Sequence, residues 1–338
     1  MAITTAGGMS ADAGAAKRTD DPLELGPPGP RQQRARWRSR LTRLDMVVTP
    51  YLLIAPFFVL FAVFGLFPLL YNAVVSFRTW RLDDPTLDGW AGFDNYVKLV
   101  HDGDFWHALV NTLGIFVLST VPQLTLALII ASLLNRRVRF RTGLRVGVLL
   151  PYITPLAAST LIFQQLFGHD FGIVNHLLGW VGAGPVDWQG NRLASWVAIA
   201  TMVDWRWTGY NALIYLAAMQ SVPRDLYEAA ALDGAGPWRQ LWRITVPMIR
   251  PTLIFTVVLA TIGQMQLFTE PLLFNEKVSD ATGGTDGQFS TVALLIYKTG
   301  WKDLNLGYAA AMAWALFLMI VVFASINAFI THRAGDRR

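Results

Sequence analysis

The stretch that separates two long apolar runs, residues 224–247, reads RDLYEAAALDGAGPWRQLWRITVP. Its first ten residues have a helix-forming composition, and Asp225 and Glu228 lie early in it, where negative charge complements the helix dipole. Gly234 permits the left-handed conformation that ends a helix, and Pro237 can open the next one. The sequence therefore predicts two short helices joined by a glycine turn.

The second half of this stretch predicts a short amphipathic helix over residues 238–246, closed by Pro247. Small alanine side chains on the first helix allow the close approach of another chain. The whole segment, residues 224–250, is thus predicted to form a compact knob that can seat in a groove of a soluble partner. An ordinary helical hairpin without a docking role is the alternative.

The chain contains six apolar runs, four before this hairpin and two after it. A helix needs roughly 20 apolar residues to cross a bilayer, and each run is about that long. Only 15% of the residues are charged and 53% are hydrophobic, whereas soluble domains carry about 25% charged residues. Pro151 and Pro155 interrupt the third run, which is tolerated where neighbouring helices or water satisfy the freed carbonyls. The chain is predicted to be an all-α integral membrane protein with spans near residues 48–77, 108–134, 143–167, 194–220, 249–274 and 305–331.

The charges between these runs predict the orientation of the chain. Basic residues cluster before the first run, between the second and third, between the fourth and fifth, and after the last. Aspartates dominate the connection after the first run. Because positive charge accumulates on the cytoplasmic side and the number of spans is even, both termini are expected to be cytoplasmic. The net charge of +5 therefore indicates membrane orientation and not nucleic-acid binding.

The two ends are predicted to lie outside the membrane domain. Residues 1–44 lack a continuous apolar core and contain an arginine-rich stretch, so they are predicted to be a disordered basic cytoplasmic tail and not a signal peptide. Residues 45–332 form the predicted transmembrane domain, and residues 333–338 form a short cytoplasmic tail.

The sequence lacks the patterns of common catalytic and metal sites. Cysteine is absent and the five histidines form no HExxH pair, so no metal site is predicted. The glycine-rich segment 283–290 lacks the lysine of a phosphate-binding GxxxxGK[ST] loop, so the chain is not expected to hydrolyse ATP itself. No catalytic residue and no cofactor are assigned to this chain. A secondary transporter or a membrane enzyme is the weaker alternative class.

The hairpin resembles the EAA loop of binding-protein-dependent ABC importer permeases, which reads Glu-Ala-Ala, three residues, Gly, nine residues, Ile-x-Leu-Pro. Val246 replaces the leucine, and the positions that hold every spacing are Glu228, Ala229, Ala230, Gly234, Ile244 and Pro247. Over roughly residues 45–331 the chain is similar to the larger permease subunit of maltose-type systems, in the carbohydrate-uptake branch. The segment 275–290 departs from the glycine-rich pattern of that branch.

This resemblance implies a type I ABC importer permease fold and a non-catalytic, multi-pass subunit in the cytoplasmic (inner) membrane of a bacterial cell. It implies a heterodimer with a second homologous permease, two ABC ATPase subunits that carry ATP and magnesium, and an extracytoplasmic sugar-binding lipoprotein. The hairpin would dock in a cleft of the ATPase and transmit ATP-driven closure to the helices. The residues that the resemblance assigns to this coupling are Glu228, Ala229, Ala230, Asp233, Gly234, Ile244 and Pro247.

Aromatic and amide side chains in the fourth and fifth predicted spans indicate where a solute would pass. Polar groups at mid-membrane depth are costly and usually face a cavity or another helix. Aromatic faces and amides suit a neutral polyhydroxylated ligand, and the resemblance implies sugar contacts on the same two helices. Interhelical packing is the alternative for each residue. The predicted pathway residues are Trp207, Tyr210, Asn211, Gly263, Gln264 and Gln266.

Two charges in the fourth span, Asp204 and Arg206, are unusual for this branch. Because they are two residues apart, they point to different helix faces, and each is expected to find a partner on another helix.

The leading hypothesis is a permease for an oligo- or disaccharide. An anion-binding role for Arg206 would instead indicate a phosphorylated or acidic substrate. A permease of the same architecture for another solute class, such as glycerol phosphate, phosphodiesters or polyamines, is the alternative.

Overall fold

The computed structural model describes residues 48–136, 139–275 and 281–333 of the 338-residue chain. The chain divides into two units, Met1–Phe67 and Pro68–Arg338. The tail predicted at residues 1–44 lies outside the described residues, as do residues 334–338 of the tail predicted at 333–338, whereas Arg333 is the last residue of α15.

The first predicted span is one helix, Val48–Val75, which contains a π-helical turn at Ala62–Leu66. The described part of the chain is otherwise helices and loops, with isolated β-bridges in place of strands. Short 3₁₀ and π turns lie at Pro85–Leu87, Leu241–Thr245 and Lys298–Lys302. The α-helices are α2 (Phe67–Val75), α3 (Asp94–His101), α4 (Gly103–Asn135), α5 (Arg141–Ile153), α6 (Leu156–Leu166), α7 (Ile173–Trp180), α8 (Arg192–Gln220), α9 (Arg224–Leu232), α10 (Pro237–Gln240), α11 (Val246–Met248), α12 (Arg250–Met265), α13 (Thr269–Phe274), α14 (Val292–Tyr297) and α15 (Leu306–Arg333).

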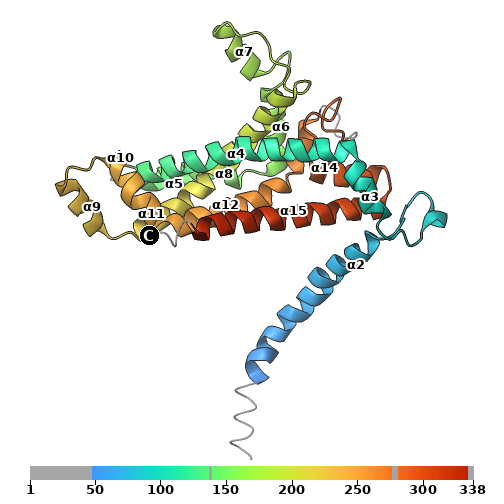
Figure 1. The fold of residues 1–338 in the computed structure, drawn as a ribbon. Coiled ribbons are helices and arrows are strands. Elements are labelled where there is room, and N and C mark those ends of the chain that lie inside the picture. The colour runs from blue at the N-terminus through green and yellow to red at the C-terminus, as the bar shows by residue number, and fades with distance from the viewer. Residues whose placement is uncertain (1–47, 137–138, 276–280, 334–338) are drawn as a thin grey trace, which may run out of the picture. The chain divides into compact units, whose positions relative to one another are not determined.

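The long helices of the second unit form a bundle. Figure 1 shows α4, α8, α12 and α15 running lengthwise, with α9 and α10 at one end of the bundle and α3 and α14 at the other. The most extensive helix contact joins α4 to α8, and α12 packs on both α15 and α4. The hairpin and the loops around α14 are therefore at opposite ends of the bundle.

Small residues allow the bundle helices to approach closely, as expected for helices that pack in lipid. Ala127 and Ala131 of α4 and Ala198 and Ala212 of α8 are fully buried. At Gly209 of α8, an added Cβ would collide with the carbonyl oxygen of Val148 in α5. The α5 backbone therefore rests directly on α8.

The structure supports most of the predicted spans. Among the described residues, Val48–Val75, Gly103–Asn135 and Leu306–Asn327 are long and apolar enough to cross a membrane, and two bent helix pairs also qualify. One bent pair is the third predicted run, in which α5 and α6 meet at 88°. The interruption predicted from the two prolines is therefore confirmed. The fourth predicted run coincides with α8, which does not qualify on composition but spans 29 residues.

The prediction of one continuous helix over residues 249–274 is wrong. Helix α12 ends at Met265 and α13 starts at Thr269, because the backbone leaves helical geometry between them. The carbonyl of Leu267, freed by this break, accepts a hydrogen bond from Thr291 Oγ1 at 2.7 Å. A side chain from the α14 segment thus satisfies the broken backbone, which is the condition for such a break inside a membrane domain.

The contact at Gly209 predicts a specific loss of stability. Gly209→Ala is expected to push α5 away from α8 and to destabilise the subunit by about 1–3 kcal/mol, the usual cost of overpacking. The control is Gly147→Ala on α5, where the new methyl group meets nothing within 4 Å. Thermal unfolding of the purified subunit should show a lower midpoint for the first variant only; equal midpoints would contradict the contact.

Candidate functional site

The hairpin predicted between the fourth and fifth spans is present at one end of the bundle (Figure 1). Gly234 has φ +76°, and the amide of Ala235 donates to the carbonyl of Ala230 at 2.8 Å, which closes the end of α9. Helix α10 begins at Pro237, as the sequence predicts. The left-handed glycine turn between two short helices is therefore confirmed.

The predicted end of the second helix at Pro247 is wrong. After α10 the chain forms a π-helical turn over Leu241–Thr245 and continues through α11 to Met248. Pro247 lies in the first turn of α11, where its missing N–H is tolerated. The helix ends at Ile249, whose φ and ψ of −92° and 9° are not helical.

The hairpin is anchored at its base and exposed at its tip. Tyr227 and Thr245 share a hydroxyl–hydroxyl hydrogen bond of 2.9 Å that ties its two helices together. Leu241 and Ile249 are buried in a cluster with residues from the end of α8. At the tip, Leu232 is 91% exposed. Of the seven predicted coupling residues, those at the exposed tip are Glu228, Ala229, Asp233 and Gly234, and those that are partly buried are Ala230, Ile244 and Pro247.

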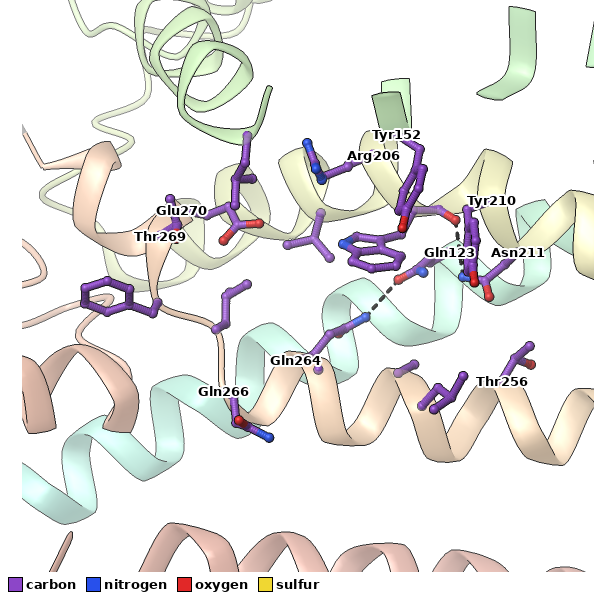
Figure 2. Close-up of a pocket in the computed structure, with 18 residues that line it drawn as sticks. Gln123, Tyr152, Arg206, Tyr210, Asn211, Thr256, Gln264, Gln266, Thr269 and Glu270 are labelled. Atoms are coloured by element: carbon purple, nitrogen blue, oxygen red, sulfur yellow. Dashed lines mark hydrogen bonds between the residues drawn. The ribbon is translucent and has the colours of Figure 1, made fainter. Parts of the chain in front are cut away.

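A cavity of about 490 Å³ lies inside the second unit, between α5, α8, α12, α13 and neighbouring parts of α4 and α6 (Figure 2). Its size is within the range of small-molecule sites. All the residues predicted from the sequence to form the solute pathway line it. They are Trp207, Tyr210, Asn211, Gly263, Gln264 and Gln266.

Three aromatic rings form one wall of the cavity. Tyr152 stacks on Tyr210 with ring centroids 4.7 Å apart and an interplanar angle of 20°. Trp207 meets Tyr152 edge-on at 5.2 Å and Tyr210 at 5.7 Å. The prediction missed Tyr152, which reaches the cavity because α5 packs on Gly209 and bends at the prolines. The sequence feature that could have indicated Tyr152 is its position directly after Pro151, at the interruption of the third predicted span.

Gln264 belongs to a buried hydrogen-bond network between α12 and α4. Its Oε1 accepts from the hydroxyls of Ser119 and Thr120, and its Nε2 donates to Gln123 Oε1 at 2.8 Å. These hydrogen bonds of Gln264 join α12 to α4, as the alternative of interhelical packing predicts. Gln266 differs, because it is exposed and its amide donates to the carbonyl of Ile262 in its own helix at 3.1 Å.

The charged groups at the middle of α8 have different surroundings. Nη1 of Arg206 donates to the carbonyl of Thr154 at 2.7 Å, and its guanidinium lies 5.8 Å from the Tyr152 ring centroid. The expected partner on another element is therefore confirmed for Arg206. Oδ1 of Asp204 is buried without a hydrogen-bond partner among the described residues, so the same expectation is wrong for this oxygen.

Glu270 is a second charged residue of the cavity, and the sequence reasoning missed it. Its side chain is 5% exposed, it lies in the first turn of α13, and it lines the cavity together with Arg206. Its position depends on the break between α12 and α13, which Pro271 marks because it has no N–H to donate to the carbonyl of Leu267.

A bundle of apolar helices with bent spans, an internal cavity and an exposed hairpin at one end defines a multi-pass membrane permease. Residues 123–336 match the family described as binding-protein-dependent transport system inner membrane component, and the chain belongs to this family.

Individual relatives agree with this family. The chain is 35% identical over 284 residues to the lactose transport system permease protein LacF of Rhizobium radiobacter, covering 83% of this chain and 93% of the relative. It is 30% identical over 298 residues to the diacetylchitobiose uptake system permease protein DasB of Streptomyces coelicolor, covering 86% and 88%. The chain is therefore a non-catalytic permease subunit of an ABC transporter.

Solved structures show the same fold. A chain of a bacterial alginate ABC transporter, solved in complex with an alginate pentasaccharide-bound periplasmic protein, superposes with a TM-score of 0.73 at 21% identity. The match covers 87% of this chain and 97% of that one. The type I importer permease fold expected from the hairpin motif is confirmed.

Substitution of Gln264, inside α12, should lower the stability of the subunit, whereas substitution of Gln266, directly after α12, should not. Gln264→Ala leaves Ser119, Thr120 and Gln123 without their partner and is expected to cost about 1–3 kcal/mol of stability. Gln266→Ala removes only a bond to its own helix and serves as the control. A thermal midpoint that falls for both variants, or for neither, would contradict the network.

Proposed function

We propose that this chain is the permease of an ATP-binding-cassette sugar importer and carries an oligo- or disaccharide. Together with a second homologous permease it forms the pathway for a sugar that an extracytoplasmic binding protein delivers. The observation that carries the proposal is the cavity wall of Tyr152, Trp207 and Tyr210, next to the Asn211 and Gln266 amides. The names of the relatives, which are permeases for lactose and for diacetylchitobiose, support the same class of cargo.

The cavity suits a sugar for two chemical reasons. The apolar face of a pyranose ring packs on flat aromatic side chains, which offer large contact area with few rotatable bonds. Its hydroxyl groups both donate and accept, which matches amide groups that carry an N–H donor and a carbonyl acceptor. A purely apolar cavity would leave those hydroxyls without partners.

The hairpin supplies the coupling to ATP. In the proposal its exposed tip, around Glu228 and Gly234, docks into a cleft of an ABC ATPase, and two such ATPases serve the permease pair. The buried base at Leu241 and Ile249 supports this role, because force applied at the tip reaches the end of α8. ATP and magnesium bind to the ATPases and not to this chain.

The orientation follows from the same hairpin, and we infer that both termini are cytoplasmic. Arg141 and Arg145 lie at the start of α5, directly after the connection between the second and third spans, and the side chains of both reach the hairpin end of α8. With its amide oriented to face these donors, Gln220 Oε1 accepts from their Nη2 atoms at 2.8 and 2.7 Å. Two basic connections at one end of the bundle support a cytoplasmic position for that end.

The proposed function is tested by reconstitution. The chain, its partner permease and the ATPase are placed in proteoliposomes with the binding protein, and uptake of radiolabelled lactose is measured with and without ATP. Uptake is expected only when ATP and the ATPase are present. Uptake driven by an ion gradient in the absence of the ATPase would contradict the proposal.

The docking role of the hairpin predicts the effect of one bulky residue. Gly234→Trp is expected to leave the permease inserted but to abolish ATPase co-purification and uptake, because an added side chain points into open space at the tip. Gly182→Trp is the matched control, since Gly182 also has a positive φ (+79°) and open surroundings but lies after α7. Retention of the ATPase by the first variant, or its loss in the second, would contradict the assignment.

The aromatic wall predicts a second pair of variants. Tyr210→Ala removes the ring that stacks on Tyr152 and is expected to lower uptake about tenfold, since an aromatic pair contributes about 0.5–1.5 kcal/mol beyond its buried area. Tyr210→Phe keeps the ring and should retain most uptake. Stimulated ATPase activity is measured in parallel, and wild-type values of both quantities for Tyr210→Ala would remove this residue from the pathway.

A further inference from the structure

The cavity contains two opposite charges that do not form an ion pair. Arg206 and Glu270 both line it, and neither takes part in an ion pair among the residues that the structure describes. They reach the same cavity from different elements, Arg206 from α8 and Glu270 from α13. In the view of Figure 2, Arg206 appears between Glu270 and Tyr152.

Each charge is held in place by a different element. Arg206 is the middle residue of α8 and is fixed by the Thr154 carbonyl at 2.7 Å and by the ring of Tyr152. Thr154 lies in the bend between α5 and α6, where Pro155 provides no N–H. Glu270 is fixed by α13, which packs on α6 and α8. The two side chains are therefore positioned by different elements, and the Arg206 guanidinium is engaged by Thr154.

Separated charges inside a membrane domain are expensive, and such groups usually mark the path of a solute. A ligand that fills the gap must accept hydrogen bonds from the guanidinium and donate to the carboxylate. A pair of sugar hydroxyls does both without adding charge. An anionic ligand would satisfy Arg206 but meet like charge at Glu270, and a cationic ligand would meet the reverse.

We propose that Arg206 and Glu270 form a charge-selectivity pair that admits neutral sugars and disfavours sugars with a carboxylate, phosphate, sulfate or ammonium group. One sugar hydroxyl accepts from the Arg206 guanidinium and another donates to the Glu270 carboxylate, while the ring packs on Trp207 and Tyr210. This inference rests on the proposed sugar transport and specifies the chemical class of the cargo.

The test uses sugar binding to the assembled transporter in nanodiscs, so that the binding protein does not filter the ligands. The probes are lactose, its carboxylate analogue lactobionate and its amine analogue lactosamine, and binding is followed by tryptophan fluorescence. The wild-type complex is expected to bind lactose about tenfold more tightly than either charged sugar. Glu270→Gln should shift the ratio about tenfold towards lactobionate, and Arg206→Gln should shift it by a similar factor towards lactosamine.

Two further variants separate this effect from a loss of structure. Asp204→Asn removes a charge two residues from Arg206, at a position that does not line the cavity, and is expected to leave both ratios unchanged. Glu270→Asp keeps the charge on a shorter side chain and should weaken all three sugars without changing their ratios.

The outcomes distinguish the two levels of the proposal. If the two charge variants, Glu270→Gln and Arg206→Gln, bind sugar with the same affinity ratios among the three probes as the wild type, the selectivity pair is overturned. The proposed sugar function would remain intact. A wild-type complex that prefers lactobionate to lactose would also overturn the pair. If the wild-type complex bound none of the three sugars, the proposed sugar function would fall and the pair with it.

Discussion

The close contact of α8 with α4 and α5 is the packing interaction on which the rest of the second unit depends. Inside a bilayer, apolar side chains gain nothing by leaving lipid for another helix, so association depends on close packing and on hydrogen bonds. Gly209 brings the α5 backbone against α8, and buried alanines do the same for α4. This contact places Tyr152 on Tyr210 and the Thr154 carbonyl on Arg206. The cavity wall is therefore a consequence of small residues elsewhere on the same helix.

Two interrupted helices complete the cavity. The bend between α5 and α6 frees the Thr154 carbonyl, which then accepts from Arg206. The break between α12 and α13 frees the Leu267 carbonyl, which Thr291 satisfies, and brings Glu270 to the cavity. Irregular backbone at membrane depth is tolerated where it lines a cavity and finds such partners. The same breaks that cost helical hydrogen bonds thus create the polar features of the site.

Much of this arrangement could be predicted from the sequence, because it depends on local signals. Gly234 and Pro237 mark the hairpin, and Pro151 and Pro155 mark the bend between α5 and α6. The helical spacing of Trp207, Tyr210 and Asn211 indicates which side of α8 faces the cavity. Glu270 was missed although Pro271, the next residue, marks the break, because a proline has no N–H to donate to the carbonyl four residues earlier, here that of Leu267. The bonding of Gln264 could not be predicted, because its partners lie about 140 residues away on α4. Features that depend on contacts between distant segments are missing from local patterns.

Helix α8 connects the hairpin to the cavity without a break. It runs from Arg192 to Gln220, and the 14 residues from Arg206 to its end span about 21 Å at 1.5 Å per residue. The buried base of the hairpin packs on the same end of α8. Arg206, Trp207 and Tyr210 all lie on this unbroken helix. Glu270 comes after the break between α12 and α13, and α13 in turn packs on α6 and α8, so the two charged residues of the cavity are connected to the hairpin end of α8 by different routes.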